Sequence, residues 1–156
     1  MGKVKDHIST ILLLLAVVVI YFYNNPRVDF NADSGKGIQF YRGTWDDALT
    51  LAKSENKLIF VDVYATWCGP CKKLKKYTFS SEKAGNYFNS NFINVTIDGE
   101  RGEGALLAAQ YGVKSYPSLY LIDNEGRVIA KSEGYQSASR LIKWAKAALA
   151  RLSDQK

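Results

Sequence analysis

The sequence predicts an α/β fold, in which a mixed central sheet has helices on both faces and one N-terminal hydrophobic segment precedes it. Apolar segments rich in β-branched and aromatic residues alternate with segments whose apolar residues recur at helical spacing. Towards the C-terminus two such β-rich segments flank the turn-forming residues 123–126, and an amphipathic segment follows them. This order indicates a hairpin and a covering helix. With 156 residues, 47% of them hydrophobic, the chain has room for one packed domain.

Five segments are predicted to be strands because each is short, apolar and rich in β-branched or aromatic residues. The segment 58–64 is apolar at nearly every position, which is typical of a central strand covered on both faces. The other predicted strands are 38–41, 92–98, 118–122 and 128–133.

Helices are predicted where apolar residues recur at helical spacing next to capping residues. Thr44, followed three residues later by Asp47, forms a capping pattern at the start of the first one. Gly112 is placed to end one helix, and Ser137 is placed to begin the last. The predicted helices are 44–55, 68–79, 81–88, 104–111 and 138–152.

The two cysteines, Cys68 and Cys71, lie three positions apart. A disulfide-stapled scaffold needs more cysteines at wider spacing, and a zinc site needs about four ligands. The single histidine, His7, is far from them in the sequence, so we expect no metal site. The sequence also has no Gly-rich phosphate loop and no Ser/His/Asp set. We therefore expect a redox-active dithiol that works without a bound cofactor.

Cys68 is predicted to stand at the start of a helix that follows the apolar strand 58–64. The positive end of a helix dipole favours a thiolate, so Cys68 would be the exposed nucleophile. Cys71, one turn further in, would be the resolving thiol that releases the mixed disulfide. Pro70 is tolerated between them because the first turn of a helix has no partner for the missing N–H.

Asp62 is a lone carboxylate within the apolar strand 58–64. It should therefore be buried, and burial raises the pKa of a carboxyl group.

The charge pattern argues against nucleic-acid binding. The net charge is +6, but the sequence has no long basic run interleaved with aromatic residues. The densest basic cluster comprises Lys72, Lys73, Lys75 and Lys76. We interpret this cluster as the solvent-exposed face of a helix. The alternative is that its charges stabilise the Cys68 thiolate or attract acidic partners.

From about Phe40 to Leu152 the chain resembles the thioredoxin superfamily. The resemblance rests on the strand containing Asp62, on residues 67–72 (Trp-Cys-Gly-Pro-Cys-Lys) and on residues 112–119. Residues 71–79 look most like the C-terminal thioredoxin domain of transmembrane thiol:disulfide interchange proteins, which relay electrons across the inner membrane to periplasmic partners. The resemblance implies the thioredoxin fold.

The resemblance also implies roles for individual residues. Trp67 would shield the dithiol, with Gly69 and Pro70 between its cysteines. Pro117 would be a cis-proline facing it, leaving the backbone of Tyr116 free to bind an extended substrate peptide. Asp62 would accept the proton of Cys71. Many thioredoxins place a lysine near this carboxylate, and the matching position here is Asn94, so Asp62 should titrate differently.

Residues 1–23 are predicted to be a membrane anchor or a signal peptide. Lys3 and Lys5 precede an uninterrupted apolar and aromatic run over 11–23. Thirteen apolar residues suit a cleaved signal peptide better than a span of about twenty. No small-x-small cleavage site follows the run, however, so we favour an uncleaved anchor with the lysines on the cytoplasmic side. Residues 24–36 would then be a linker, and 37–156 the thioredoxin-like domain.

These observations predict a monomeric thiol–disulfide oxidoreductase in the bacterial inner membrane, with its domain facing the periplasm. Its partners would be protein or peptide thiols and disulfides and an upstream electron donor, and it would act as a reductase. One alternative is a cleaved, soluble periplasmic or secreted oxidase or isomerase. Another is a redox-inert peptide-binding module, although such a module would not need all of Cys68, Cys71, Asp62 and Pro117.

Overall fold

The computed structural model has a mixed four-stranded sheet in the order β2-β1-β3-β4. β1 (Leu58–Tyr64) pairs in parallel with β2 (Phe92–Asp98) and antiparallel with β3 (Ser118–Ile122). β4 (Val128–Glu133) pairs antiparallel with β3, as the hairpin prediction required. The structure describes residues 2–30, 32 and 34–153. Residues 1 and 154–156, which the sequence analysis assigned to the ends of the anchor and the domain, lie outside the described residues.

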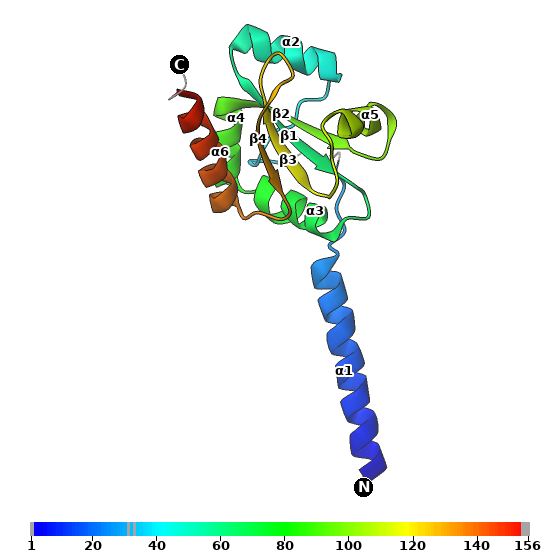
Figure 1. Ribbon diagram of the computed structural model, residues 1–156. Helices are drawn as coiled ribbons and strands as arrows, with labels where there is room; N and C mark the ends of the chain where they lie inside the picture. Colours follow the sequence, from blue (N-terminus) through cyan, green and yellow to red (C-terminus); the bar gives the residue numbers. More distant parts are fainter. Residues whose placement is uncertain (1, 31, 33, 154–156) are drawn as a thin grey trace.

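Helices cover both faces of the sheet (Figure 1), which confirms the predicted fold class. α2 (Trp45–Glu55) and α5 (Gly102–Gln110) pack on one face against Ile59, Val61 and Val63. α4 (Glu82–Asn91) and α6 (Ala138–Ser153) pack on the other face, around Phe60 and Leu121. β1 is buried on both sides, as predicted for a central strand. The predicted capping pair also forms, because the Thr44 side chain accepts from the Asp47 N–H.

The predicted strand 38–41 is not a strand in the structure, so this prediction is wrong. Of its backbone N–H groups, that of Ile38 donates to the Phe79 carbonyl and that of Gln39 to the Asn89 side chain. Tyr41 donates to β2, through the Asn94 carbonyl at 2.7 Å. The segment runs beside β2, but its polar groups are shared among three elements, so no ladder forms.

The predicted helix 68–79 has two parts. α3 (Gly69–Lys73) is α-helical, and the π-helix η1 (Leu74–Phe79) continues it directly. Both are on the α4–α6 face of the sheet, where Leu74 and Phe79 join the core around Phe60. The helix predicted over 81–88 extends to Asn91, and the backbone N–H of its C-cap residue Phe92 still bonds to the Phe88 carbonyl.

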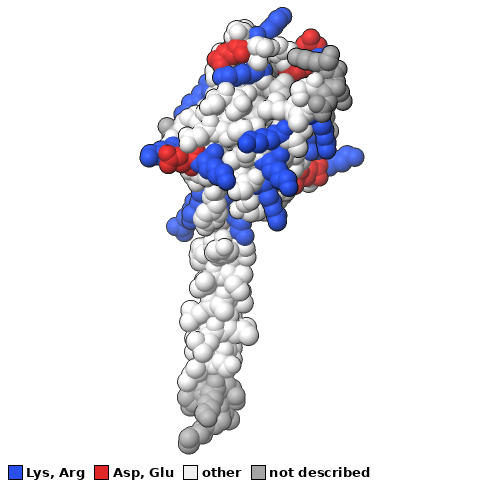
Figure 2. Space-filling view, turned by 90° about the vertical axis from the view of Figure 1, so that its left-hand side faces the viewer, with Lys and Arg blue, Asp and Glu red and all other residues white. Residues whose placement is uncertain are grey.

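α1 (Gly2–Asn24) projects from the domain as a single long helix (Figure 1). Its residues His7–Asn24 are long enough and apolar enough to cross a membrane, and none of them is buried inside the protein. A signal sequence near an N-terminus has the same properties. The described part of α1 shows no charged side chain in Figure 2, whereas Lys and Arg side chains lie around its junction with the domain.

Candidate active site

Cys68 and Cys71 form a disulfide where β1 leads into α3, with an S–S distance of 2.04 Å and a Cα–Cα distance of 5.3 Å. Cys68 is the N-cap residue of α3, and its Sγ accepts a hydrogen bond from the Cys71 N–H at 3.1 Å. Pro70 lies in the first turn of the helix, where its missing N–H needs no partner. The predicted dithiol at a helix N-terminus is therefore present.

The sequence analysis predicted that Cys68 is exposed. This prediction is wrong, because Cys68 is only 2% exposed. Its side chain belongs to a buried cluster with Phe30, Tyr64, Ala65 and Cys71. Phe30 comes from the segment that was predicted to be a linker. A residue 38 positions away along the chain, and not the helix start alone, thus contributes to the environment of Cys68.

We call residues 25–30, 32 and 34 the strap. Pro26 and Phe30 are buried and Val28 is half-buried, whereas the intervening Arg27 and Asp29 are exposed. The Phe30 ring stacks on Tyr64 with ring centroids 3.9 Å apart and planes 5° apart. Because alternate residues face the domain, residues 26–30 pack on it as an extended segment, so the predicted linker is in contact with the domain.

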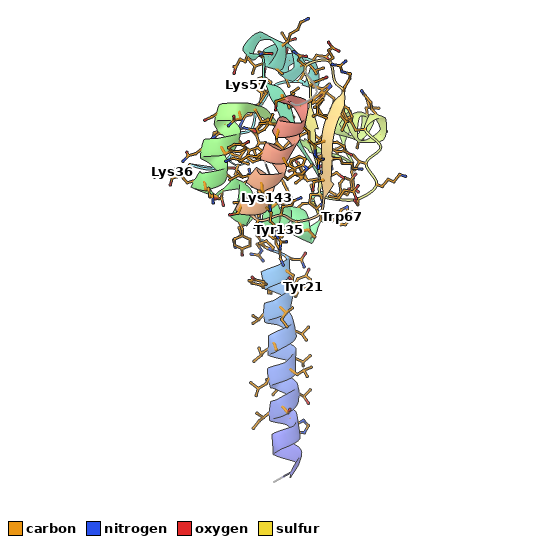
Figure 3. All side chains as sticks on the ribbon, turned by 60° about the vertical axis from the view of Figure 1, so that its left-hand side comes forward. Tyr21, Lys36, Lys57, Trp67, Tyr135 and Lys143 are labelled. Atoms are coloured by element: carbon orange, nitrogen blue, oxygen red, sulfur yellow. A yellow bond between two sulfur atoms is a disulfide. The ribbon has the colours of Figure 1, made fainter. Side chains whose placement is uncertain are left out.

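The end of α1 lies against the start of α3. Lys73 Nζ donates to Asn24 Oδ1 at 2.6 Å and lies 5.1 Å from the centre of the Tyr23 ring. A Cβ atom at Gly69 would lie 3.1 Å from the Asn24 carbonyl oxygen, so the approach leaves little room for a larger residue. Figure 3 shows Trp67 at this same end of the domain.

The basic cluster after Cys71 does not simply face solvent. Lys75 Nζ donates to the Ala32 carbonyl of the strap at 2.7 Å, and Lys73 binds the end of α1 as described. Lys76 is exposed and lies over the Tyr77 ring. The predicted solvent-exposed face is only partly correct, because Lys73 and Lys75 are half-buried and each has a partner in the N-terminal part of the chain.

Asp62 is 2% exposed, as the sequence predicted. Its Oδ2 accepts a hydrogen bond from Thr96 Oγ1 at 3.1 Å, whereas its Oδ1 is buried without a partner among the described residues. Burial raises the pKa of Asp62 to about 7, although the Thr96 hydrogen bond and the positive charge of Lys75 both act to lower it. A buried carboxyl group with this pKa can exchange a proton near neutral pH.

The residue opposite Asp62 on β2 is Thr96, and Asn94 lies opposite Phe60. The Asn94 amide donates to the Gln39 carbonyl at 3.2 Å. Asn94, which matches the lysine that many thioredoxins place near this carboxylate, therefore does not lie opposite Asp62. The positive charge that acts on Asp62 is that of Lys75, in η1.

Trp67 directly precedes Cys68, and Tyr116 and Pro117 come before β3. The Tyr116–Pro117 peptide bond is cis, the isomer that the resemblance implies. Tyr116 packs against the cluster that contains Cys68, and its hydroxyl donates to the Gly99 carbonyl at 3.0 Å. Trp67 is 65% exposed, with its ring 6.1 Å from that of Tyr116.

Three residues that contact the predicted site residues or the cysteines were not identified from the sequence: Phe30, Thr96 and Glu100. Glu100 accepts from Trp67 Nε1 at 3.0 and 3.1 Å, which holds the exposed ring in place. Thr96 could have been found from the parallel register of β1 and β2, and Phe30 from the alternation of apolar residues in the strap. Nothing in the local sequence distinguishes Glu100 from other surface carboxylates. Among the described residues no group of His, Cys, Asp and Glu is arranged to hold a metal ion.

Comparison with known proteins places this geometry in context. Residues 45–149 match the family model of the thioredoxin-like domain. The chain is 30% identical over 95 residues to the thiol:disulfide interchange protein DsbD of Yersinia pestis, covering 59% of this chain but only 16% of that protein. It is 35% identical over 86 residues to a thioredoxin-like protein of Synechocystis, covering 55% of this chain and 76% of that protein.

A solved structure is similar over most of its length. It is a provisionally assigned disulphide isomerase from Bacteroides thetaiotaomicron, 42% identical to this chain with a TM-score of 0.65. The match covers 72% of this chain and 93% of that one.

Proposed function

Because the chain belongs to the thioredoxin-like domain family, we propose that it is a membrane-anchored thiol–disulfide oxidoreductase that reduces disulfides of extracytoplasmic proteins. The observation that supports this proposal most directly is the Cys68–Cys71 disulfide at the N-terminus of α3. The similarity to DsbD supports it further, although the chain spans only about a sixth of that protein's length.

The reaction is two successive thiol–disulfide exchanges. The Cys68 thiolate attacks one sulfur of the partner disulfide, and the other partner sulfur leaves as a thiolate that takes up a proton. Cys71 then attacks the Cys68 Sγ, which forms the intramolecular disulfide and releases the first partner sulfur. Two electrons have passed to the partner, and an upstream dithiol donor restores the reduced form. The dithiol itself is the redox group, so the reaction uses no further cofactor.

Asp62 is proposed to take the proton of Cys71 in the second exchange. Its carboxyl group is buried, and with a pKa of about 7 it is partly ionised at neutral pH, which a proton acceptor requires. Tyr116 packs against the cluster that contains the dithiol and lies beside Trp67. An extended partner segment is proposed to bind there through the backbone of Tyr116, next to the cis Pro117. These contacts would hold the partner sulfur near Cys68.

We predict a reduction potential below about −220 mV for the Cys68–Cys71 pair, on the reducing side of the glutaredoxin range. The intervening Gly69 and Pro70 provide no side-chain donor to the Cys68 sulfur, and an ionised Asp62 disfavours a nearby thiolate. Lys73 and Lys75 act in the opposite sense, but the Lys73 ammonium group lies at an exposed contact, where solvent screens its charge, and the Lys75 charge acts on Asp62. The disulfide should therefore be the stable form, and the pKa of Cys68 should be nearer 7 than 4.

Equilibrating the protein against glutathione buffers and counting its free thiols measures this potential. A value more oxidising than about −180 mV would favour the isomerase or oxidase alternative, which the similarity to the Bacteroides protein makes the second candidate.

We predict that α1 is retained in the mature protein as an anchor. The apolar stretch ends in Tyr21–Tyr23, aromatic residues typical of a bilayer surface. Asn24, at the end of α1, also contacts Lys73 in the domain. N-terminal sequencing should find Met1 or Gly2, and the protein should resist carbonate extraction from membranes. A mature N-terminus between Asn24 and Gly37 would instead establish a cleaved signal peptide.

One assay distinguishes the proposed oxidoreductase from the alternative, a redox-inert peptide-binding module on the same fold. The reduced full-length chain, in detergent micelles, should reduce insulin disulfides in the presence of a dithiol donor. A chain that binds peptides without catalysing this reduction would contradict the oxidoreductase proposal.

A further inference from the structure

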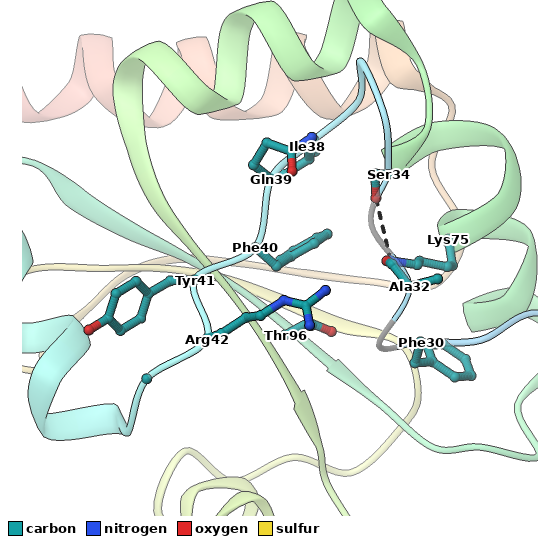
Figure 4. Close-up of a pocket in the computed structure, with 11 residues that line it drawn as sticks. Phe30, Ala32, Ser34, Ile38, Gln39, Phe40, Tyr41, Arg42, Lys75 and Thr96 are labelled. Atoms are coloured by element: carbon teal, nitrogen blue, oxygen red, sulfur yellow. Dashed lines mark hydrogen bonds between the residues drawn. The ribbon is translucent and has the colours of Figure 1, made fainter.

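A cavity of about 370 Å³ lies between the strap and the segment that runs beside β2 (Figure 4). Lys75 and Thr96 both line it, together with Phe30 and Arg42. Thr96 is also the hydrogen-bond donor to Asp62. The cavity thus connects the surface to the side chain that binds the buried carboxylate.

Lys75 is held in this cavity by the N-terminal part of the chain. Its Nζ donates to the Ala32 carbonyl at 2.7 Å, lies 3.4 Å from Ser34 Oγ and lies 5.5 Å from the centre of the Phe40 ring. A lysine side chain on a helix surface normally samples many rotamers, and these contacts restrict Lys75 to one region. Its ammonium group is therefore a fixed charge.

Asp62 is on the same face of the sheet as this charge. Side chains alternate along a strand, so Asp62 points to the same side of β1 as Phe60, which packs against Leu74 and Phe79 of η1. η1 is the element that contains Lys75. The ammonium group and the carboxyl group therefore lie on one side of β1, with Thr96 bordering the cavity between them.

We propose that Lys75 is a positioning residue for Asp62, and that Ala32 and Ser34 of the strap hold its ammonium group where it stabilises the carboxylate. This inference rests on the proposed role of Asp62 as the proton acceptor. It assigns to the N-terminal segment a part in the redox chemistry, since the residues that hold Lys75 follow shortly after α1.

Few other ionisable groups of the described chain face Asp62 from the elements packed against it. Across β3 its partner is the apolar Leu119, and across β2 it is the uncharged Thr96. Tyr64 is two residues further along β1, and burial raises its pKa, so it stays neutral near pH 7. Arg42 lines the same cavity from the other side.

The test compares Lys75→Met with Lys75→Arg in the full-length chain in detergent micelles. In the oxidised protein, the Asp62 carboxyl carbon should titrate in NMR with a midpoint near 7. Loss of the cation makes the carboxylate less favourable, so Lys75→Met should move this midpoint upward by ~0.5 pH unit, less than the 1–3 units caused by a cation in direct contact. Lys75→Arg keeps the charge and should restore the original midpoint.

The same shift in the titration midpoint of Asp62 should also change the rate of the second exchange step. Reduced protein is mixed with a chromogenic aryl disulfide, and release of the second aryl thiolate reports the attack of Cys71 on Cys68. At pH 7 an upward shift of ~0.5 unit halves the ionised fraction, so this step should slow about twofold in Lys75→Met. Lys76→Met removes an exposed charge from the same helix and is the matched control, which should behave as the original protein.

Equal titration midpoints in Lys75→Met and the original protein would overturn the proposal. The variant Asp62→Asn separates this failure from failure of the proposed function. If Asp62→Asn alters the pH dependence of the second step and Lys75→Met does not, then the role of Lys75 is wrong and that of Asp62 stands. If Asp62→Asn has no effect, the proton-acceptor role is wrong and the Lys75 proposal, which rests on it, falls with it.

Discussion

The Cys68→Ser variant is expected to reduce insulin more slowly than the original protein by on the order of 10³-fold or more. Losses of this size are found when an enzyme loses its nucleophile. The reason is that a serine hydroxyl at this position neither forms a thiolate at the α3 N-terminus nor exchanges with a disulfide. The measurement is the rate of insulin precipitation with a dithiol donor at neutral pH. Lys76→Met, a change at an exposed position of η1, which continues α3, should retain the original rate.

The Cys71→Ser variant should also lose turnover but in a different way. Cys68 can still attack the partner disulfide, but no neighbouring thiol releases the product, so mixed disulfides accumulate. Non-reducing gel electrophoresis should show covalent complexes that a reductant dissolves. The double variant Cys68→Ser/Cys71→Ser should trap nothing. Normal insulin reduction by either single variant would show that this dithiol is not the active site.

The Asp62→Asn variant should be more stable than the original protein above neutral pH. Burial raises the pKa of Asp62 from 3.8 to about 7 in the folded state. Between these values the folded protein binds more protons than the unfolded chain, so its stability falls as pH rises from about 4 to about 7. The difference corresponds to roughly 4 kcal/mol, present in full below pH 4 and lost above pH 7.

An asparagine at this position removes the buried charge and with it this pH dependence. Part of the gain is offset, because the N–H₂ group of the introduced amide would be buried where Asp62 Oδ1 now has no partner, at a cost of about 1–3 kcal/mol. Urea unfolding of the oxidised protein at pH 5 and pH 8, followed by tryptophan fluorescence, measures both effects. The original protein should lose stability between the two pH values, and the variant should not. Parallel changes in both proteins would mean that Asp62 does not titrate in this range.

Local sequence was sufficient wherever the structure depends on neighbouring residues. The strands 58–64, 92–98, 118–122 and 128–133 have the predicted bounds because their apolar, β-rich composition and the flanking turn residues are contained within or beside each segment. The start of α2 was predicted for the same reason, since its capping pair spans only four residues. The helix start at the dithiol, with Pro70 in its first turn, is also a local feature.

Local patterns were not sufficient where the structure depends on residues far apart in the chain. Residues 38–41 have strand-like composition, but their N–H groups bond to three different elements, a choice that depends on where Phe79, Asn89 and β2 lie. In the same way the family resemblance matched Asn94 to the position of a lysine near the carboxylate, whereas the parallel register of β1 and β2 puts Thr96 opposite Asp62.

The sequence by itself determined the fold class, the dithiol and its place at the start of a helix, and the burial of Asp62. Each of these follows from periodicity, spacing or the composition of one segment. The tertiary structure decided that Cys68 is buried, that the strap packs on Tyr64 and that Lys75 is held by Ala32. These features are contacts between residues tens of positions apart, and their energies depend on shape and distance in the folded chain. A segment with alternating apolar residues, such as the strap, can pack on a surface only after the sheet and α3 have formed that surface.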